Sequence, residues 1–143
     1  PYDFTVTGND FDVYGKADSE NAIVTYGRLF WQAVKAKRIL ENDGINIKII
    51  KLNKIIPLPS EAVSQCESLK KVHFFEEGVT SGGIGEKFGS ELCERGFKGE
   101  FSLKAFPDCF VKQGDANDIL SQYGLDCLGM AKSFLKEKEE IER

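Results

Sequence analysis

The sequence predicts a three-layer α/β/α sandwich, in which helices cover both faces of a sheet of about five strands. Two observations predict this fold. Short runs rich in β-branched and aromatic residues alternate along the chain with segments whose apolar residues recur at helical spacing. Helices of roughly ten or more residues between successive strands favour parallel pairing through right-handed crossovers. The chain of 143 residues is long enough for one domain with its own core.

Composition and charge argue against several classes of protein. The net charge is -4, so no basic surface is expected to collect phosphate backbones, and nucleic acid is not a predicted partner. No apolar run approaches the roughly 20 residues that cross a bilayer, so no membrane partner is predicted. The four cysteines form no Cys-x-x-Cys pair, which argues against a zinc site and indicates idle thiols in a reducing cytoplasm: Cys66, Cys93, Cys109 and Cys127.

The first third of the chain predicts three strands and one helix. Residues 1–10 are polar and are interpreted as a linker or incoming arm, and the sequence opens as if cut from a longer chain. Residues 11–14 alternate and end at a glycine, as a short edge strand does. A compact strand over residues 22–26 precedes a helix from about residue 29 to residue 41, which an Asn-Asp-Gly turn ends. The next strand spans residues 45–52, where isoleucines alternate with polar residues.

Prolines then interrupt regular structure before a second helix. The segment Pro57-Leu58-Pro59 breaks the chain, and Ser60 is the predicted N-cap of a helix that runs to about Leu69. Glu61, in the first turn, suits the positive end of the helix dipole. This helix is predicted to lead into a strand over residues 72–76.

A glycine-rich loop and a third helix follow that strand. The loop spans residues 78–83, and the helix runs to about residue 94, with its apolar residues one turn apart on a single face. Gly96 is the predicted left-handed residue at its C-terminal end. A strand over residues 101–106 completes the predicted sheet.

Two helices close the chain. Asp115 is predicted to cap a short helix that ends at Gly124, and the last helix is predicted to start after Asp126. Residues 136–143 are so rich in charge that they are interpreted as a solvated or frayed tail.

The most pointed candidate site is the segment from Glu76 to Gly85, which follows a strand and opens a helix. Ligand sites of open parallel sheets lie beyond the carboxyl ends of strands, and the N–H groups of a helix N-terminus attract anions. Adjacent glutamates on a strand point to opposite faces, which argues against a shared two-carboxylate site. A structural turn or an interface is favoured, and an anion site or a dinucleotide site stays open. The candidate residues are Glu76, Glu77, Gly82, Gly83, Gly85 and Gly89.

No other segment carries a self-sufficient catalytic set. His73, the only histidine, lies inside a strand and is interpreted as a structural or surface histidine, because no nucleophile elbow accompanies it. Cys109 has no evident basic neighbour to lower the pKa of its thiol. The run from Gly114 to Asn117 is interpreted as a turn and helix cap rather than as a diphosphate motif. We therefore predict no catalytic residue, no metal ligand and no cofactor-binding residue in this chain.

Four segments, in order and at matching spacing, resemble the C-terminal domain of the transketolase-like thiamine-diphosphate enzymes. They are AIVTYG, KLNKIIPLP before a helix that begins SEAV, FFEEGVTSGGIG, and AFPDCFVKQGDANDILSQYGLDCLGM. The resemblance covers about residues 11–135. Within the family, the fourth segment is most similar to the 1-deoxy-D-xylulose-5-phosphate synthases, through Phe106, Pro107, Asp108, Phe110, Gly114, Gly124, Leu125 and Asp126. Gly78 departs from that pattern and is closer to the 2-oxo acid dehydrogenase beta subunits.

The resemblance implies a mixed five-stranded sheet whose first strand runs antiparallel at one edge. It also implies that thiamine diphosphate and Mg²⁺ are held by other domains of a parent enzyme and not by this one. The parent would be a cytoplasmic homodimer that condenses pyruvate with glyceraldehyde 3-phosphate, with release of carbon dioxide, in isoprenoid precursor synthesis. Thiazolium chemistry of this kind belongs to the cofactor. This domain would hold the dimer together and support the remaining domains, and alone it would be inactive.

Two alternatives remain open on the sequence. The parent could be a transketolase or a 2-oxo acid dehydrogenase beta subunit rather than a deoxyxylulose phosphate synthase. The chain could instead be a stand-alone anion-binding regulatory module, for which the glycine-rich helix start is the supporting feature.

Overall fold

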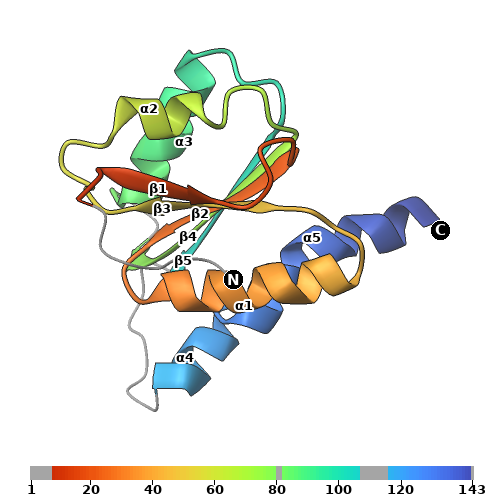
Figure 1. The fold of residues 1–143 in the computed structure, drawn as a ribbon. Helices are drawn as coiled ribbons and strands as arrows, with labels where there is room; N and C mark the ends of the chain where they lie inside the picture. The colour runs from red at the N-terminus through yellow and green to blue at the C-terminus, as the bar shows by residue number, and fades with distance from the viewer. Residues whose placement is uncertain (1–7, 80–81, 107–115, 143) are drawn as a thin grey trace.

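Five strands form one mixed sheet in the computed structural model, which describes residues 8–79, 82–106 and 116–142 (Figure 1). The strand order is β1-β3-β2-β4-β5. β1 runs antiparallel to β3 at one edge, and the other neighbours are parallel. The strands are β1 (Phe11–Tyr14), β2 (Asn21–Tyr26), β3 (Lys48–Leu52), β4 (Lys71–Val79) and β5 (Glu100–Phe106). The predicted sheet and its antiparallel edge strand are confirmed.

Helices cover both faces of the sheet, as the sandwich prediction requires. Helices α2 (Ser60–Ser64) and α3 (Ile84–Glu94) lie on one face (Figure 1). The opposite face carries α1 (Leu29–Asn42), α4 (Ala116–Gln122) and α5 (Cys127–Glu142). Two hydrophobic clusters result, one on each side of the sheet.

The alternation of side chains along the central strands builds these two clusters. On β2, Ile23 packs toward α1, whereas Val24 packs toward α3. On β4, Phe75 and Phe74 divide in the same way. Both strands are buried on both faces, which explains why they are apolar runs rather than alternating ones.

Several predicted element ends are confirmed. Helix α1 ends one residue beyond the predicted position. Gly96 and Gly124 follow α3 and α4 with φ of 83° and 71°, the left-handed region in which glycine has no steric penalty. Asp126 precedes α5, and its Oδ1 accepts the N–H of Gly129 at 2.9 Å. That hydrogen bond is the N-cap pattern, which the sequence did not assign to this residue.

The second helix was predicted too long. It ends at Ser64, because the chain beyond it forms tight turns. The N–H of Cys66 donates to the carbonyl of Val63, and the N–H of Leu69 donates to the carbonyl of Cys66. Pro59, not Ser60, is the N-cap residue, and no side chain caps this helix. The third strand was likewise predicted to begin too early.

That third strand, β3, begins at Lys48, where pairing with β2 begins, and Ile45 before it belongs to the turn that ends α1. The N–H of Ile45 bonds the carbonyl of Leu40, which is the last-turn pattern of a helix that closes on a glycine. Gly44, with φ of 76°, permits that turn. Isoleucine alternation alone does not distinguish such a turn from the start of a strand.

Some predictions fall outside the described residues. The predicted cap at Asp115, the thiol of Cys109 and residues 1–7 of the predicted linker are among them. The backbone of α5 continues to Glu142, so the predicted charged tail belongs to that helix. Within the described part of the chain, no helix combines the length and the apolar character that crossing a membrane requires.

Candidate functional site

The glycine-rich segment lies where two neighbouring parallel strands, β2 and β4, end (Figure 1). β4 leaves its regular pairing with β5 at this point. β4 advances from Phe75 to Val79 while β5 advances only from Lys104 to Phe106, so residues 76–78 form a bulge. Glu76 lies two residues beyond Phe74, so the alternation of the strand places it on the same face as Phe74, over the start of α3.

Glu76 is the centre of the site. Its side chain is 1% exposed, although it carries a carboxylate. Oε1 accepts the N–H of Gly85 at 2.9 Å, and Oε2 accepts the N–H of Ile84 at 3.2 Å and the hydroxyl of Tyr26 at 2.8 Å. The first N–H groups of a helix have no partner within the helix, and its N-terminus favours negative charge. Glu76 therefore caps α3 from a neighbouring strand.

This geometry decides what the helix start can bind. The N-cap residue Gly83 has no side chain, and within the described residues Glu76 is the side chain that caps this end of α3. The N–H of Gly82 is also engaged within the chain, by Oε2 of Glu86 at 2.8 Å. The anion that occupies the N-terminus of α3 is thus the protein's own carboxylate. An external anion would have to displace Glu76, which is buried.

Tyr26 and Thr25 tie the end of β2 to the same cluster. Burial raises the pKa of Tyr26, and the hydrogen bond to Glu76 and the charges of Glu76 and Glu77 raise it further. The phenol therefore stays protonated and remains a donor. The Thr25 hydroxyl donates to the carbonyl of Phe75 at 2.8 Å. These bonds hold two strand ends together beside α3.

Glu77 points away from this cluster. Its carboxylate pairs with the guanidinium of Arg28, and the two side chains are 31% and 60% exposed. The hydrogen bond to Glu77 raises the pKa of Arg28. The two adjacent carboxylates therefore occupy separate environments, on the two faces to which neighbouring residues of a strand point.

The candidate glycines have different surroundings from one another. A Cβ at Gly85 would lie 2.9 Å from both Oε1 of Glu76 and Cδ1 of Phe74, and nearer still to Leu103. A Cβ at Gly89 would lie 2.5 Å from Cε1 of Phe101. These two glycines let α3 lie close to its own sheet. An interface role for the Glu76–Gly85 loop stays a prediction, but the close approach at Gly85 and Gly89 is made within the chain.

His73 is a core residue, as its structural interpretation requires. It is 2% exposed, and its ring stacks on Phe134 of α5 with centroids 4.3 Å apart. The Ser133 hydroxyl donates to the carbonyl of Met130 at 2.6 Å, so Nδ1 of His73 is the donor in its 2.9 Å bond to Ser133. Burial lowers the pKa of His73 to about 4, with smaller contributions from Lys71 and Lys104.

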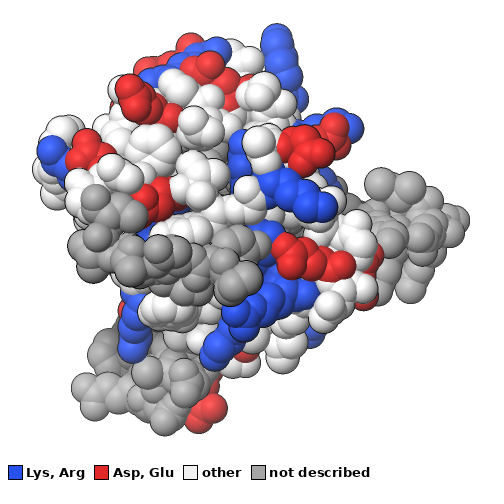
Figure 2. Space-filling view, in the orientation of Figure 1, with Lys and Arg blue, Asp and Glu red and all other residues white. Residues whose placement is uncertain are grey.

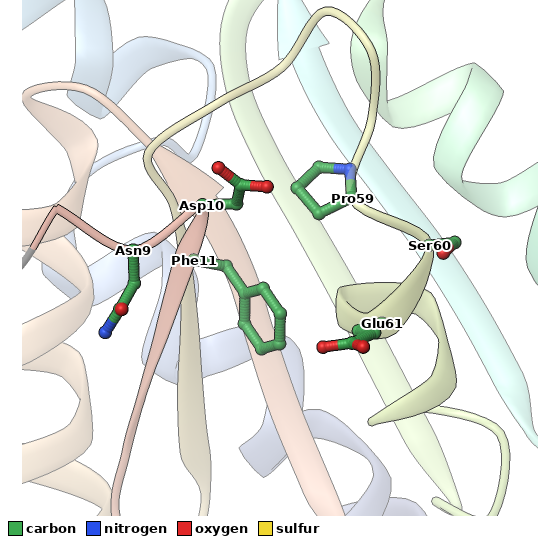
Figure 3. Close-up of a pocket in the computed structure, with 6 residues that line it drawn as sticks. All are labelled: Asn9, Asp10, Phe11, Pro59, Ser60 and Glu61. Carbon is green, nitrogen blue, oxygen red and sulfur yellow. The ribbon is translucent and has the colours of Figure 1, made fainter.

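A surface hollow of about 510 Å³ lies between the start of β1 and the start of α2 (Figure 3). Its lining includes two carboxylates, Asp10 and Glu61, and the ring of Phe11. Among the described residues that line it, no histidine, cysteine or basic side chain would form a nucleophilic or acid–base set with them. Across the described residues, no group of three or more histidine, cysteine or acidic side chains is placed to hold a metal ion.

The charges of the face shown in Figure 2 are mixed. Lysine and arginine side chains are interspersed with aspartate and glutamate over the described part of this face. The titratable groups with clearly shifted pKa values, Tyr26, Arg28, Cys66 and His73, do not gather in one cavity. The contacts described for these residues close strand ends, cap a helix and fill the core.

These features define an α/β/α sandwich with a mixed sheet of order β1-β3-β2-β4-β5. Helix α3, which follows β4, is capped by the carboxylate of Glu76. Residues 14–130 match the family model described as "Transketolase, C-terminal domain". The chain belongs to that family.

Similar proteins agree with this assignment. The chain is 33% identical to a 1-deoxy-D-xylulose-5-phosphate synthase of Dehalococcoides mccartyi, over 82% of this chain and 19% of that protein. It is 30% identical to the synthase of Carboxydothermus hydrogenoformans, over 90% of this chain and 20% of that protein. A solved structure described as "Split gene transketolase, inactive beta4 tetramer" has the same fold, with a TM-score of 0.80, 20% identity, and coverage of 95% of this chain and 46% of its own. The chain thus spans about a fifth of the synthases that it matches.

Proposed function

We propose that this chain acts as the C-terminal domain of a 1-deoxy-D-xylulose-5-phosphate synthase. The observation that carries the proposal is its similarity to proteins of that name over most of its own length. The parent enzyme would condense pyruvate with glyceraldehyde 3-phosphate and release carbon dioxide, in the cytoplasm, as a step toward isoprenoid precursors.

The part of this chain in that enzyme would be architectural. The polar groups of the described site residues form hydrogen bonds with one another. Glu76 and Tyr26 would therefore direct no free donor or acceptor toward a substrate. Thiamine diphosphate and Mg²⁺ would be bound by the remaining domains, and the parent would be a homodimer. The thiazolium ring would supply the electron sink for decarboxylation. This domain would position its neighbours and be inactive alone.

The first test is the mass of the native polypeptide that carries this chain. An antibody raised against residues 1–143 is used on an extract of the source cells. A band several times heavier than 16.0 kDa is expected, and a band at that mass would contradict the assignment to a multidomain enzyme.

The second test is the reaction. The native protein is assayed for carbon dioxide release from pyruvate with glyceraldehyde 3-phosphate as acceptor. Parallel assays offer a ketose phosphate donor, as a transketolase requires, and a 2-oxo acid with a dehydrogenase acceptor. Activity in either parallel assay without the first would contradict the proposal and favour that alternative.

The capping network offers a control that is specific to this domain. Glu76→Gln in the native enzyme is expected to lower thermal stability while leaving KM for pyruvate unchanged, because Glu76 supports α3 and contacts no reacting group. The matched control is Glu77→Gln, which removes an equal charge one residue away. A raised KM in the Glu76 variant, with unchanged stability, would contradict the architectural role.

A further inference from the structure

Strand β5 forms an open edge of the sheet. It pairs with β4 on one side, and no described residue pairs with its other side. It is not a short edge, since it spans residues 100–106. An unpaired edge of this length presents a row of free N–H and C=O groups that another strand can bind.

The direction of these groups follows from the bonds that β5 already makes. The N–H of Glu100 donates to the carbonyl of Lys70 at 2.8 Å, so Glu100 directs its backbone groups toward β4. In a parallel ladder the residues that face the neighbour alternate along the strand. Phe101 and Leu103 therefore direct their N–H and C=O groups outward, to the open edge.

The exposed side chains of β5 carry opposite charges at equal distances along the strand from its middle. Glu100 and Lys104 are its two exposed residues, and Ser102 lies midway between them. No ion pair joins Glu100 or Lys104 to another described residue. All three side chains alternate with Phe101 and Leu103, so they share one face of the sheet.

We propose that the β5 edge binds a second copy of this chain, by antiparallel pairing of β5 with β5 about a two-fold axis at Ser102. In this register Phe101 faces Leu103 of the other copy, and both residues have outward backbone groups. Each such pair exchanges two hydrogen bonds, and the axis generates the pair twice. Glu100 faces Lys104 of the other copy in the closely spaced positions without hydrogen bonds, where side chains are nearest.

Charge selects this register among its neighbours. An axis at Phe101 would place Lys98 opposite Lys104 of the other copy, and like charges directly opposite are destabilising. An axis at Leu103 would place Lys104 opposite Ser102 and leave Glu100 without a cation. Of these three axes, only the one at Ser102 places Glu100 of each copy opposite Lys104 of the other, which makes two pairs of opposite charges. Residues 100–104 of β5 pair in regular register with β4, so the proposed pairing uses a part of β5 that lies before the β4 bulge.

The test exchanges the charges. Glu100→Lys alone and Lys104→Glu alone each create two like-charge contacts across the axis, and each is expected to weaken self-association of the 143-residue chain roughly tenfold or more in sedimentation equilibrium. The double variant Glu100→Lys/Lys104→Glu restores opposite charges and is expected to restore association. Lys35→Glu on α1 is the control with an equal change in net charge, and it is expected to associate as the unsubstituted chain does.

A thiol introduced at the axis tests the register independently. Ser102→Cys places two thiols opposite each other, at a Cα separation of about 4.5 Å that a disulfide spans. Mild oxidation is expected to yield a dimer whose peptide map joins the β5 peptides of the two copies through position 102 of each. Unchanged association of both single charge variants, or failure of the introduced thiol to cross-link in an associated chain, would overturn the proposal. So would a double charge variant that associates as poorly as the single variants.

This proposal and the enzyme assignment fail separately. The β5 pairing rests on backbone direction and charge within this chain, whichever reaction the parent performs. If the native protein lacks the synthase activity while the charge exchange restores association, the enzyme assignment fails and the pairing stands. If the activity is present and all charge variants associate equally, the pairing fails and the assignment stands.

Discussion

Removing the carboxylate of Glu76 is the sharpest test of the site as described. In Glu76→Ala, two backbone N–H groups and the Tyr26 hydroxyl lose their acceptor inside the protein. Hydrogen bonds to charged groups contribute about 1.5–3 kcal/mol each, and donors left buried without a partner add a further cost. Because part of this is regained by water that enters at the loop, we expect a loss of roughly 3–5 kcal/mol in the free energy of unfolding.

The matched control is Glu77→Ala, one residue along the same strand. Its carboxylate pairs with Arg28, and both side chains are at least partly exposed. Exposed ion pairs contribute about 0–1 kcal/mol, so this variant should remain within that range of the unsubstituted chain. Glu76→Gln should fall between the two, since the amide keeps one acceptor oxygen but turns an NH₂ group toward backbone N–H groups.

Urea unfolding followed by far-ultraviolet circular dichroism measures all three variants against the unsubstituted chain. The slopes with denaturant should agree, because the surface exposed on unfolding is the same. If Glu76→Ala and Glu77→Ala differ by less than about 1 kcal/mol, the capping argument is refuted. Hydrogen exchange of the Ile84 and Gly85 amides gives a local check, since both should lose protection only in the Glu76 variants.

Three further predictions follow from individual residues. Gly85→Ala should destabilise the chain by about 1–3 kcal/mol in urea unfolding, because a Cβ there meets Phe74, Leu103 and Glu76, whereas Ser90→Ala on the exposed side of α3 should be near neutral. His73 has a pKa lowered from 6.5 to about 4 in the folded chain, so its contribution to stability is present above pH 6.5 and is lost as the pH falls toward 4. His73→Gln should remove roughly 3 kcal/mol of that pH dependence, and an unchanged profile would contradict the burial of its neutral ring. Burial raises the pKa of the Cys66 thiol to about 12, so Cys66 should react with a thiol reagent only on unfolding, while the exposed Cys93 should react at once.

The layers and strand positions were predictable because they follow from two local features of the sequence. These are the spacing of apolar residues and the glycines at the ends of elements. The centres of β2 and β4 are rich in buried apolar residues, and Gly96 and Gly124 adopt the left-handed conformation that their positions suggested. The error at α2 has a local cause as well. Residues 65–69 carry helix-compatible side chains but close in turns whose hydrogen bonds no propensity encodes.

The role of Glu76 was not predictable from the same signals. The sequence placed glycines and two carboxylates beside a helix start, and it left open whether an external anion binds there. What holds Glu76 in place includes Tyr26, which lies 50 residues away in the chain and is brought close by the pairing of β2 with β4. Contacts between residues so far apart follow from the pairing of strands, so the sequence of one strand does not predict them.

Two places in this domain differ in whether their hydrogen-bonding groups have partners: the carboxyl ends of β2 and β4, and the β5 edge. At the carboxyl ends of β2 and β4, where α/β proteins commonly bind ligands, the described donors and acceptors already satisfy one another through Glu76, Tyr26 and Thr25. At the β5 edge, outward backbone groups and the charges of Glu100 and Lys104 have no partner among the described residues. The Glu76 cap and the proposed β5 pairing together support the joining role that we propose for this domain.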